Sequence, residues 1–190
     1  SAAVTLALLF FLSVALNEQV TEGCRCLPKH PQQQFCASDF VIRAKVTGTV
    51  PSIHPHVTAY KIKTIKIFKK LLKKTIRVIY TAHDSCDVNL NKSDYLLSGH
   101  VRDGMAVVNL CDRVEPWNSL PPVQKQYLHM FGMGCVCEIS PCTGASCLIE
   151  ILQKKCLIRV NDSSVLDDEE ALQSICLPGS AGFCTWQKYS

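Results

Sequence analysis

The chain has 190 residues, a formal net charge of +4 at pH 7 and twelve cysteines. No segment after residue 16 is long and apolar enough to cross a membrane, which excludes a membrane-spanning helix in that part of the chain. Twelve cysteines at this density predict six disulfides in a secreted protein. A zinc-finger protein is excluded by the spacing, because no pair of Cys-x-x-Cys motifs occurs.

The first 23 residues are typical of a leader that is removed from the mature protein. Residues 1–16 form an apolar stretch of signal-peptide length, which lacks Met and a positive charge at its front and is expected to be truncated there. Thr21 and Gly23 are small residues at the −3 and −1 positions of a cut before Cys24. We therefore predict a signal peptide at residues 1–23 and secretion to the extracellular space or matrix. The alternative is an apolar N-terminal helix that stays in the protein.

Residues 24–135 carry sixteen Lys and Arg against seven Asp and Glu, and their pattern is mostly β. Apolar and polar residues alternate in several segments, as they do in half-buried strands. The predicted strands are residues 39–46, 60–68, 75–80, 95–99 and 105–110, the last two joined by an Asp103-Gly104 turn. Five strands in a segment of this size predict a small closed barrel of the OB-fold type. A helix is predicted at residues 119–131.

Residues 136–190 have the opposite charge balance, with four Lys and Arg against seven Asp and Glu. So short a segment cannot bury a large core and needs disulfide staples. Each half holds six cysteines, enough for three internal bridges, so we predict two domains at residues 24–135 and 136–190. A helix is predicted at residues 167–175, where acidic residues fill the first turn. The predicted fold class is mainly β with short helices, ending in a small disulfide-stapled domain.

The most informative motif is the Cys-x-Cys pair Cys24-Arg25-Cys26, directly after the predicted cut. A cut before Cys24 frees its α-amino group beside its own backbone carbonyl, and these two groups form a bidentate metal chelator. A disulfide can hold that chelator in place. The motif therefore predicts a protein that acts by placing its N-terminus on the metal of another protein and needs no metal of its own.

Several further segments carry a family resemblance. They are Cys24-Arg25-Cys26-Leu27-Pro28, His30-Pro31-Gln32-Gln33, Phe35-Cys36, Val41-Ile42-Arg43-Ala44-Lys45, Ile79-Tyr80-Thr81-Ala82, Leu110-Cys111-Asp112, Pro116-Trp117 and Gly132-Met133-Gly134-Cys135. These segments, with the number and order of the cysteines, resemble the tissue inhibitors of metalloproteinases over the whole chain from Cys24. The ending Cys184-Thr185-Trp186-Gln187 resembles the type-1 member most.

The resemblance implies an inhibitory N-terminal OB-fold domain, a small C-terminal domain and a disulfide map that the sequence alone does not choose. Each implied bridge stays within one half and typically contributes about 2–4 kcal/mol. The implied pairs are Cys24–Cys86, Cys26–Cys111, Cys36–Cys135, Cys137–Cys184, Cys142–Cys147 and Cys156–Cys176.

The resemblance also implies a secreted inhibitor, not an enzyme, whose partners are matrix metalloproteinases and related zinc proteases. The α-amino nitrogen and carbonyl oxygen of Cys24 would displace the water on the protease zinc, and the inhibitor has no cofactor of its own. The implied protease-binding residues are Cys24, Arg25, Cys26, Leu27, Ala37, His83 and Asp84. The first four would lie along the protease cleft, the last two would form a second contact strip, and Ala37 would lie near the edge. From the residues alone, His83 and Asp84 read as ordinary loop residues.

Arg25 departs from that family, which usually carries a small hydroxyl residue, Thr or Ser, at this position. Burying an unpaired guanidinium is costly, so the protease pocket must offer a partner or a route to solvent. We predict inhibition that is narrower or weaker than the family norm, favouring proteases with deep, open or acidic pockets.

Three surface features carry alternative interpretations. The basic residues within 61–77 form either a solvated strand face or a site for sulfated glycosaminoglycans. Nucleic acid is not expected as a partner of a secreted chain. His54 and His56 have His-x-His spacing but fall in a predicted hairpin loop, which argues against a metal site. Asn91 and Asn161 begin Asn-x-Ser sequons and are glycosylation candidates.

Two classes of function remain open, and a monomer is expected for both. An inhibitor needs Cys24 as its first residue. A non-inhibitory, netrin-like module that binds matrix or a receptor shares the barrel but tolerates residues ahead of Cys24. A secreted enzyme is disfavoured, because no Ser-His-Asp order, His-Glu-x-x-His or paired acidic motif occurs and most cysteines are used in bridges.

Overall fold

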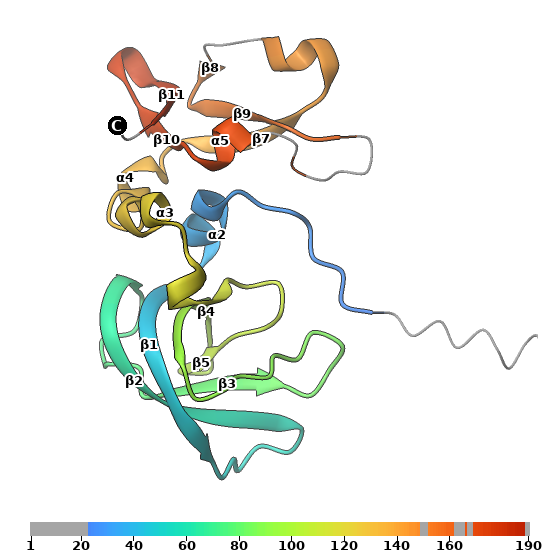
Figure 1. Cartoon of the computed structure of the whole chain (residues 1–190), viewed down its shortest axis with the longest axis vertical. Coiled ribbons are helices and arrows are strands. Elements are labelled where there is room, and N and C mark those ends of the chain that lie inside the picture. The colour runs from blue at the N-terminus through green and yellow to red at the C-terminus, as the bar shows by residue number, and fades with distance from the viewer. Residues whose placement is uncertain (1–22, 149–151, 162–165, 167–168, 189–190) are drawn as a thin grey trace, which may run out of the picture.

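The computed structural model describes residues 23–148, 152–161, 166 and 169–188. The predicted signal peptide therefore lies outside the described residues, apart from Gly23. The described chain forms two β-sheets, and short helices lie between them (Figure 1). No helix within these ranges is long and apolar enough to cross a membrane.

The first sheet is a closed five-stranded barrel with one added strand, which confirms the predicted mainly β fold and its barrel. Its strands are β1 (Phe40–Val50), β2 (Val57–Lys70), β3 (Val78–Ala82), β4 (Asp94–Arg102), β5 (Met105–Val107) and β6 (Val114–Pro116). Their order is β1-β2-β3-β5-β4-β6, and β1 also pairs with β4, which closes the barrel. The neighbours are antiparallel except β3 and β5, which pair in parallel at Tyr80 and Val107.

Alternating side chains explain why these segments form a barrel. Along β1, every second residue from Phe40 to Val46 is buried in one core cluster, whereas Lys45 between them is exposed. A strand places alternate side chains on opposite faces, so one face becomes the barrel interior. The predicted Asp103-Gly104 turn is confirmed: both residues have positive φ, 50° and 76°, as a tight two-residue hairpin requires.

The predicted helix at residues 119–131 is wrong in its extent. The structure divides this region into a 3-10 helix η1 (Trp117–Ser119), α3 (Pro122–Tyr127) and α4 (Phe131–Gly134). Proline fits the first turn of α3 but cannot continue a helix that precedes it. Glycine is a poor helix former, so Gly132 and Gly134 keep α4 short.

The second sheet was not predicted, because its strands are too short to show a period. They are β7 (Glu138–Cys142), β8 (Leu152–Gln153), β9 (Lys155–Arg159), β10 (Ile175–Pro178) and β11 (Phe183–Gln187), in the order β10-β11-β8-β9-β7. Two 3-10 helices, η2 (Gly144–Leu148) and η3 (Ser180–Gly182), complete the fold with α5 (Glu169–Leu172). The helix predicted at residues 167–175 is therefore shorter: residues 167–168 lie outside the described chain, and Ile175 begins β10.

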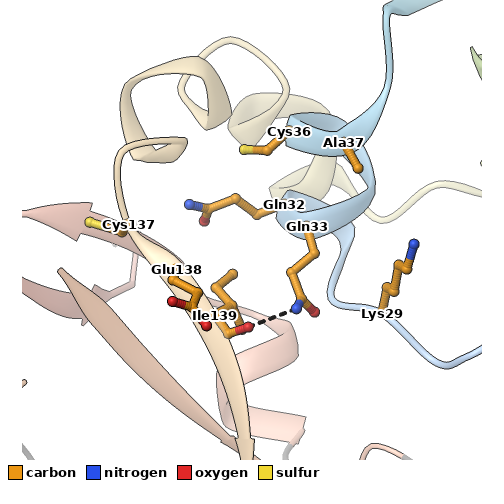
Figure 2. A pocket seen from close by; sticks show the side chains of 8 residues that line it. All are labelled: Lys29, Gln32, Gln33, Cys36, Ala37, Cys137, Glu138 and Ile139. Atoms are coloured by element: carbon orange, nitrogen blue, oxygen red, sulfur yellow. Dashed lines mark hydrogen bonds between the residues drawn. The ribbon is translucent and has the colours of Figure 1, made fainter. Parts of the chain in front are cut away.

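A short helix that the sequence analysis missed, α2 (Pro31–Ala37), joins the two sheets. Gln32 is buried and forms two hydrogen bonds with Cys176: its Nε2 donates to the carbonyl oxygen at 2.8 Å, and its Oε1 accepts from the amide at 2.9 Å. Gln33 Nε2 donates to Ile139 O at 2.8 Å, and both residues line a cavity of about 310 Å³ (Figure 2). The predicted domain boundary, residues 135 and 136, falls between α4 and β7 and stays a prediction.

The buried His30 supports the same junction. Its Nδ1 accepts the amide of Gln32 at 3.0 Å, and its Nε2 lies 2.9 Å from the carbonyl oxygen of Ala171. A carbonyl only accepts, so the proton is on Nε2. An apolar cluster that contains Phe35 and Ile175 fills the remaining space between the sheets.

Replacing Gly134 by alanine should loosen this junction. A Cβ at this buried position would collide with the Gln32 side chain and the Cys176 carbonyl oxygen, whereas a Cβ at the exposed Gly132 meets nothing within 4 Å. We expect Gly134→Ala to lower the free energy of unfolding in urea by about 1–3 kcal/mol. Gly132→Ala in the same helix should leave it unchanged or raise it by up to about 1 kcal/mol. Equal effects of the two variants would contradict this description of the junction.

Candidate functional site

The N-terminal segment, residues 23–30, belongs to no helix or strand. Two disulfides attach it to the barrel: Cys24–Cys86, with Cα atoms 4.9 Å apart, and Cys26–Cys111, with Cα atoms 5.1 Å apart. The parallel pairing of β3 and β5 explains why the two anchors are neighbours. Parallel strands end at the same edge of a sheet, and each of these cysteines follows four residues after its strand ends.

The six disulfides have the pairing that the family resemblance implies. Besides the two N-terminal bridges, they are Cys36–Cys135, Cys137–Cys184, Cys142–Cys147 and Cys156–Cys176. Every bridge joins two cysteines of the same predicted domain, residues 24–135 or residues 136–190. All twelve cysteines are used, so none remains as a free thiol.

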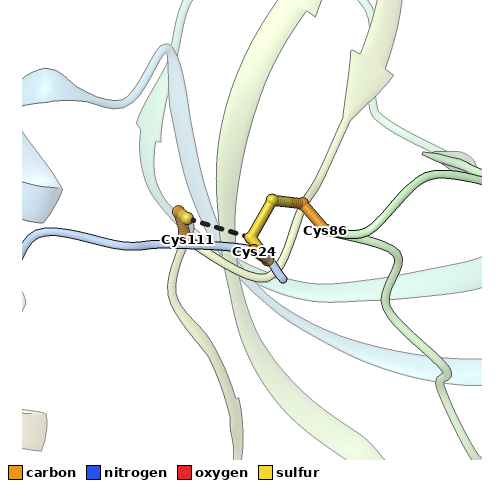
Figure 3. A group of neighbouring side chains, drawn as sticks. All are labelled: Cys24, Cys86 and Cys111. Carbon is orange, nitrogen blue, oxygen red and sulfur yellow. Dashed lines mark hydrogen bonds between the residues drawn. A yellow bond between two sulfur atoms is a disulfide. The ribbon is translucent and has the colours of Figure 1, made fainter. Parts of the chain in front are cut away.

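The two N-terminal bridges lie against each other, and Figure 3 shows Cys111 beside the Cys24–Cys86 bridge. Cys24 Sγ is 3.5 Å from Cys111 Sγ and 3.8 Å from Cys26 Sγ. The sulfurs of Cys24, Cys86 and Cys111 lie as close together as the ligands of a metal site, but each belongs to a disulfide and supplies no thiolate. The same holds for Cys137, Cys176 and Cys184, so these clusters are structural.

The loop that carries Cys86 is a compact turn directly after β3. Asp84 Oδ1 accepts the amide of Cys86 at 2.8 Å, and the Asp84 carbonyl accepts the amide of Asp87 at 3.1 Å. Asp84 thus fixes the disulfide anchor, as aspartate commonly does in turns. Its neighbour His83 is exposed and places Nε2 2.5 Å from Thr58 Oγ1.

The loop that carries Cys111 is fixed by two residues that the sequence analysis missed. Asn109 Oδ1 accepts the amides of Cys111 at 2.8 Å and Asp112 at 3.2 Å, and Asp112 Oδ2 accepts the amide of Asn109 at 2.9 Å. Burial raises the pKa of Asp112, and the Asn109 amide and the nearby charge of His100 oppose that rise. The signal was present in the sequence as an Asn and an Asp on either side of an anchoring cysteine.

The predicted site residues divide into one assembled group and one separate residue. The bridges attach the segment of Cys24, Arg25, Cys26 and Leu27 to two loops of the barrel, one of which carries His83 and Asp84. Arg25 and Cys26 are exposed, as are both loop residues, and Leu27 is 80% exposed. Ala37 lies instead at the end of α2, where it lines the cavity that faces β7 (Figure 2).

An exposed apolar residue next to the second anchor was also missed. Leu110 is 55% exposed, and its amide donates to the carbonyl oxygen of Cys86 at 2.9 Å. Leu27 and Leu110 line the same cavity of about 530 Å³, and the buried Arg113 lies at its wall. The assembled group is therefore a ridge of exposed side chains beside a cavity whose lining is part apolar and part polar.

The remaining candidates lie elsewhere on the surface. Within the described residues, His54 and His56 belong to no group of side chains that could hold a metal ion. Asn91 and Asn161 are exposed, and their glycosylation stays a prediction.

Removing the Asn109 side chain should loosen the second anchor. Asn109→Ala removes the acceptor of the Cys111 amide, whereas the Asp112 amide keeps the backbone carbonyl of residue 109, 3.0 Å away, so we expect the free energy of unfolding to fall by about 1 kcal/mol. Hydrogen exchange at the Cys111 amide should become faster. Asn118→Ala serves as the control, since Asn118 is exposed and outside both loops, and should stay within about 0.5 kcal/mol. Unchanged exchange in Asn109→Ala would contradict the role of this turn.

A comparison with protein families finds one match that covers most of the chain. The family described as "Tissue inhibitor of metalloproteinase" matches residues 22–186.

Characterised relatives align over nearly the whole length. The chain is 34% identical to metalloproteinase inhibitor 3 of Scyliorhinus torazame over 201 residues, an alignment that spans 99% of this chain and 92% of the relative. It is 35% identical to metalloproteinase inhibitor 4 of Mus musculus over 186 residues, 88% of this chain and 81% of the relative. It is 35% identical to metalloproteinase inhibitor 2 of Homo sapiens over 204 residues, 99% of this chain and 92% of the relative. The likeness of the chain's ending to the type-1 member stays a prediction.

Proposed function

The chain belongs to the family of tissue inhibitors of metalloproteinases, and from this membership we propose that it is a secreted inhibitor of zinc metalloendopeptidases. Matrix metalloproteinases are the proposed targets. Membership in an inhibitor family also decides against the enzyme hypothesis. The observation that carries the proposal is the pair of adjacent disulfides that holds Cys24 and Cys26 at one edge of the barrel.

In the proposed mechanism, the first residue of the mature protein binds the zinc of the protease. Removal of the leader after Gly23 exposes the α-amino group of Cys24 beside its carbonyl oxygen. A catalytic zinc keeps one position for water, and these two groups replace that water. An α-amine has a pKa of about 7.7–8.0 and binds metal in its neutral form, so inhibition weakens as the pH falls below this range.

The two bridges contribute by fixing the segment before it meets the protease. Residues 23–30 have no secondary structure of their own, and an untethered segment of this kind would lose its conformational freedom on binding. In the proposal, Arg25, Cys26 and Leu27 occupy the cleft, His83 and Asp84 contact its other side, and Ala37 lies at the edge. The disulfides make this arrangement largely preformed.

Secretion is part of the same proposal. Six disulfides are stable in an oxidising compartment such as the secretory pathway and the extracellular space. The apolar residues 1–16 supply the export signal, and glycans at Asn91 and Asn161 are compatible with that route. A monomer is expected.

One extra residue before Cys24 should abolish inhibition. An added alanine converts the chelating amine into an amide, which is a poor zinc ligand and carries a bulky extension. We expect the inhibition constant against a matrix metalloproteinase to rise at least about a thousandfold, or about 4 kcal/mol, relative to protein that begins at Cys24. Thermal unfolding of both forms serves as the control for folding. Equal inhibition by both would rule out the amine, and no inhibition by either would favour the non-inhibitory, netrin-like module.

Replacing Arg25 should widen the range of inhibited proteases. Because an unpaired guanidinium is costly to bury, Arg25→Thr should inhibit proteases with narrow apolar pockets about tenfold or more tightly than the parent does. Arg25→Lys is the matched control, which keeps the charge and should keep the narrow range. A panel of inhibition constants checks this prediction, which fails when Arg25→Thr inhibits no more broadly than the parent.

A second function, binding of sulfated glycosaminoglycans, is favoured by a pair of like charges. Lys45 lies opposite Lys63 across the β1–β2 ladder, and both are exposed. Like charges in directly opposed positions destabilise a sheet, and a polyanion would relieve that repulsion. We call these two residues the basic face.

Heparin chromatography checks the basic face. We expect the protein to stay on heparin resin at physiological salt and Lys45→Glu/Lys63→Glu to elute at a clearly lower salt concentration, because the attraction is screened by ions. Arg159→Glu/Lys154→Glu, with the same change in charge on the second sheet, should elute close to the parent. If the parent protein passes through the resin at physiological salt, binding of sulfated glycosaminoglycans by the basic face is ruled out.

A further inference from the structure

Strand β2 continues to Lys70, well beyond the part of it that pairs with β3. Pairing with β3 ends at Lys61, opposite Val78. One more backbone hydrogen bond follows, from the amide of Ile62 to the carbonyl oxygen of Arg77 at 2.9 Å. Beyond it only a side chain reaches across, with Thr64 Oγ1 donating to the carbonyl oxygen of Ile76 at 2.7 Å.

On its other side, β2 stays paired to its end. Its partners on β1 run from Lys45, opposite Lys63, to Phe40, opposite Lys70. Residues 65–70 therefore have a strand on one side only, and no other strand of the described chain pairs with them. We call this segment the β2 edge. An edge of this kind presents backbone N–H and C=O groups to which another strand can pair.

The β2 edge carries only apolar and basic side chains. Ile65 is 47% exposed and Ile67 42% exposed, and Leu71, just beyond, is 65% exposed. The exposed Lys66 and Lys70 stand between and after them, and neither belongs to an ion pair within the described residues. Large apolar side chains at this degree of exposure on an unpaired edge are typical of a binding surface.

Lys69 does not share in this surface. Its Nζ donates to the carbonyl oxygens of Phe35 at 3.1 Å and Cys36 at 2.7 Å, at the end of α2. Lys69 thus attaches the end of β2 to the end of α2. An edge that is already attached in this way loses less freedom when a partner strand pairs with it.

We propose that the β2 edge binds an extended acidic segment of a partner protein, which pairs with it as an additional strand. Lysines on an edge strand prevent two copies of a chain from pairing, because their charges repel. The same charges attract a strand with alternating carboxylates, whose backbone then pairs with β2 while its apolar side chains cover Ile65 and Ile67. Charge therefore selects the class of partner, and the backbone supplies the pairing.

The β2 edge is independent of the proposed inhibitory site. In Figure 1 the end of β2 and the segment that begins at Gly23 lie on opposite sides of the barrel. A bound strand would leave the N-terminal ridge accessible, so one molecule could hold a protease and an acidic partner together. The inference therefore does not depend on the protease proposal, and its test uses no protease.

The test uses three peptides of one sequence, acetyl-Glu-Val-Glu-Val-Glu-Val-Glu-amide. The first is unmodified, the second is N-methylated at its valines and the third at its glutamates. Successive N–H groups of a strand point to opposite sides, so only one of the methylated peptides loses the groups that face β2. Binding is measured by titration on the mature protein, and hydrogen exchange is followed within residues 63–70.

We expect the unmodified peptide to bind and to slow exchange in this segment. One methylated peptide should bind about as well as the unmodified one, and the other at least about tenfold more weakly. Lys66→Glu/Lys70→Glu should weaken binding of the unmodified peptide by about tenfold or more. The matched control Arg102→Glu/Lys154→Glu, with the same change in charge away from β2, should bind like the parent.

Three outcomes would overturn the proposal. Equal binding of all three peptides would mean attraction by charge alone, as to a sulfated polysaccharide, without strand pairing. If the unmodified peptide does not bind correctly folded protein, the β2 edge is not a binding site for acidic strands. Slowed exchange in residues 63–70 that rises with protein concentration without peptide would mean that a second copy occupies the edge.

Discussion

Two adjacent disulfides fix a segment that has no secondary structure of its own, and the geometry of the N-terminal site depends on them. Residues 23–30 form neither helix nor strand, and Cys24 and Cys26 attach them to two loops of the barrel. Those loops are neighbours because β3 and β5 are parallel and end at the same edge. A barrel with only antiparallel neighbours would send the ends of adjacent strands to opposite edges, and the two anchors would separate.

The second sheet also helps to fix the N-terminal segment, because it holds the helix that follows this segment. Proline at position 31 begins α2 immediately after the N-terminal segment, and Gln32 holds this helix to Cys176 through two buried hydrogen bonds. The direction in which the segment leaves α2 is therefore set by the junction between the sheets. A change at Gly134, far from Cys24 in sequence, acts on the same junction because it presses on Gln32.

The sequence predicts an element of the structure when the apolar–polar pattern of that element is long enough to be recognised. The barrel strands are long enough for alternation to identify them, and Asp103-Gly104 marks its own turn. α2 was missed because its buried positions include glutamine, which reads as surface until its partner on another element is known. Strands of two to five residues in the second sheet are too short to show a period. The disulfide pairs came from family resemblance, since six cysteines in each half allow many pairings, and Asn109 was missed because its role is local to a turn.

Zinc binding by Cys24 is tested most directly by a crystal structure of protein that begins at Cys24, bound to a matrix metalloproteinase. We expect the α-amino nitrogen and carbonyl oxygen of Cys24 both to coordinate the protease zinc, with a Zn–N distance of about 2.0–2.1 Å and no water at that position. We also expect both N-terminal disulfides to stay intact and residues 24–27 to keep the course they have in the free chain. A zinc that retains its water, with the Cys24 amine directed away from it, would contradict this mechanism.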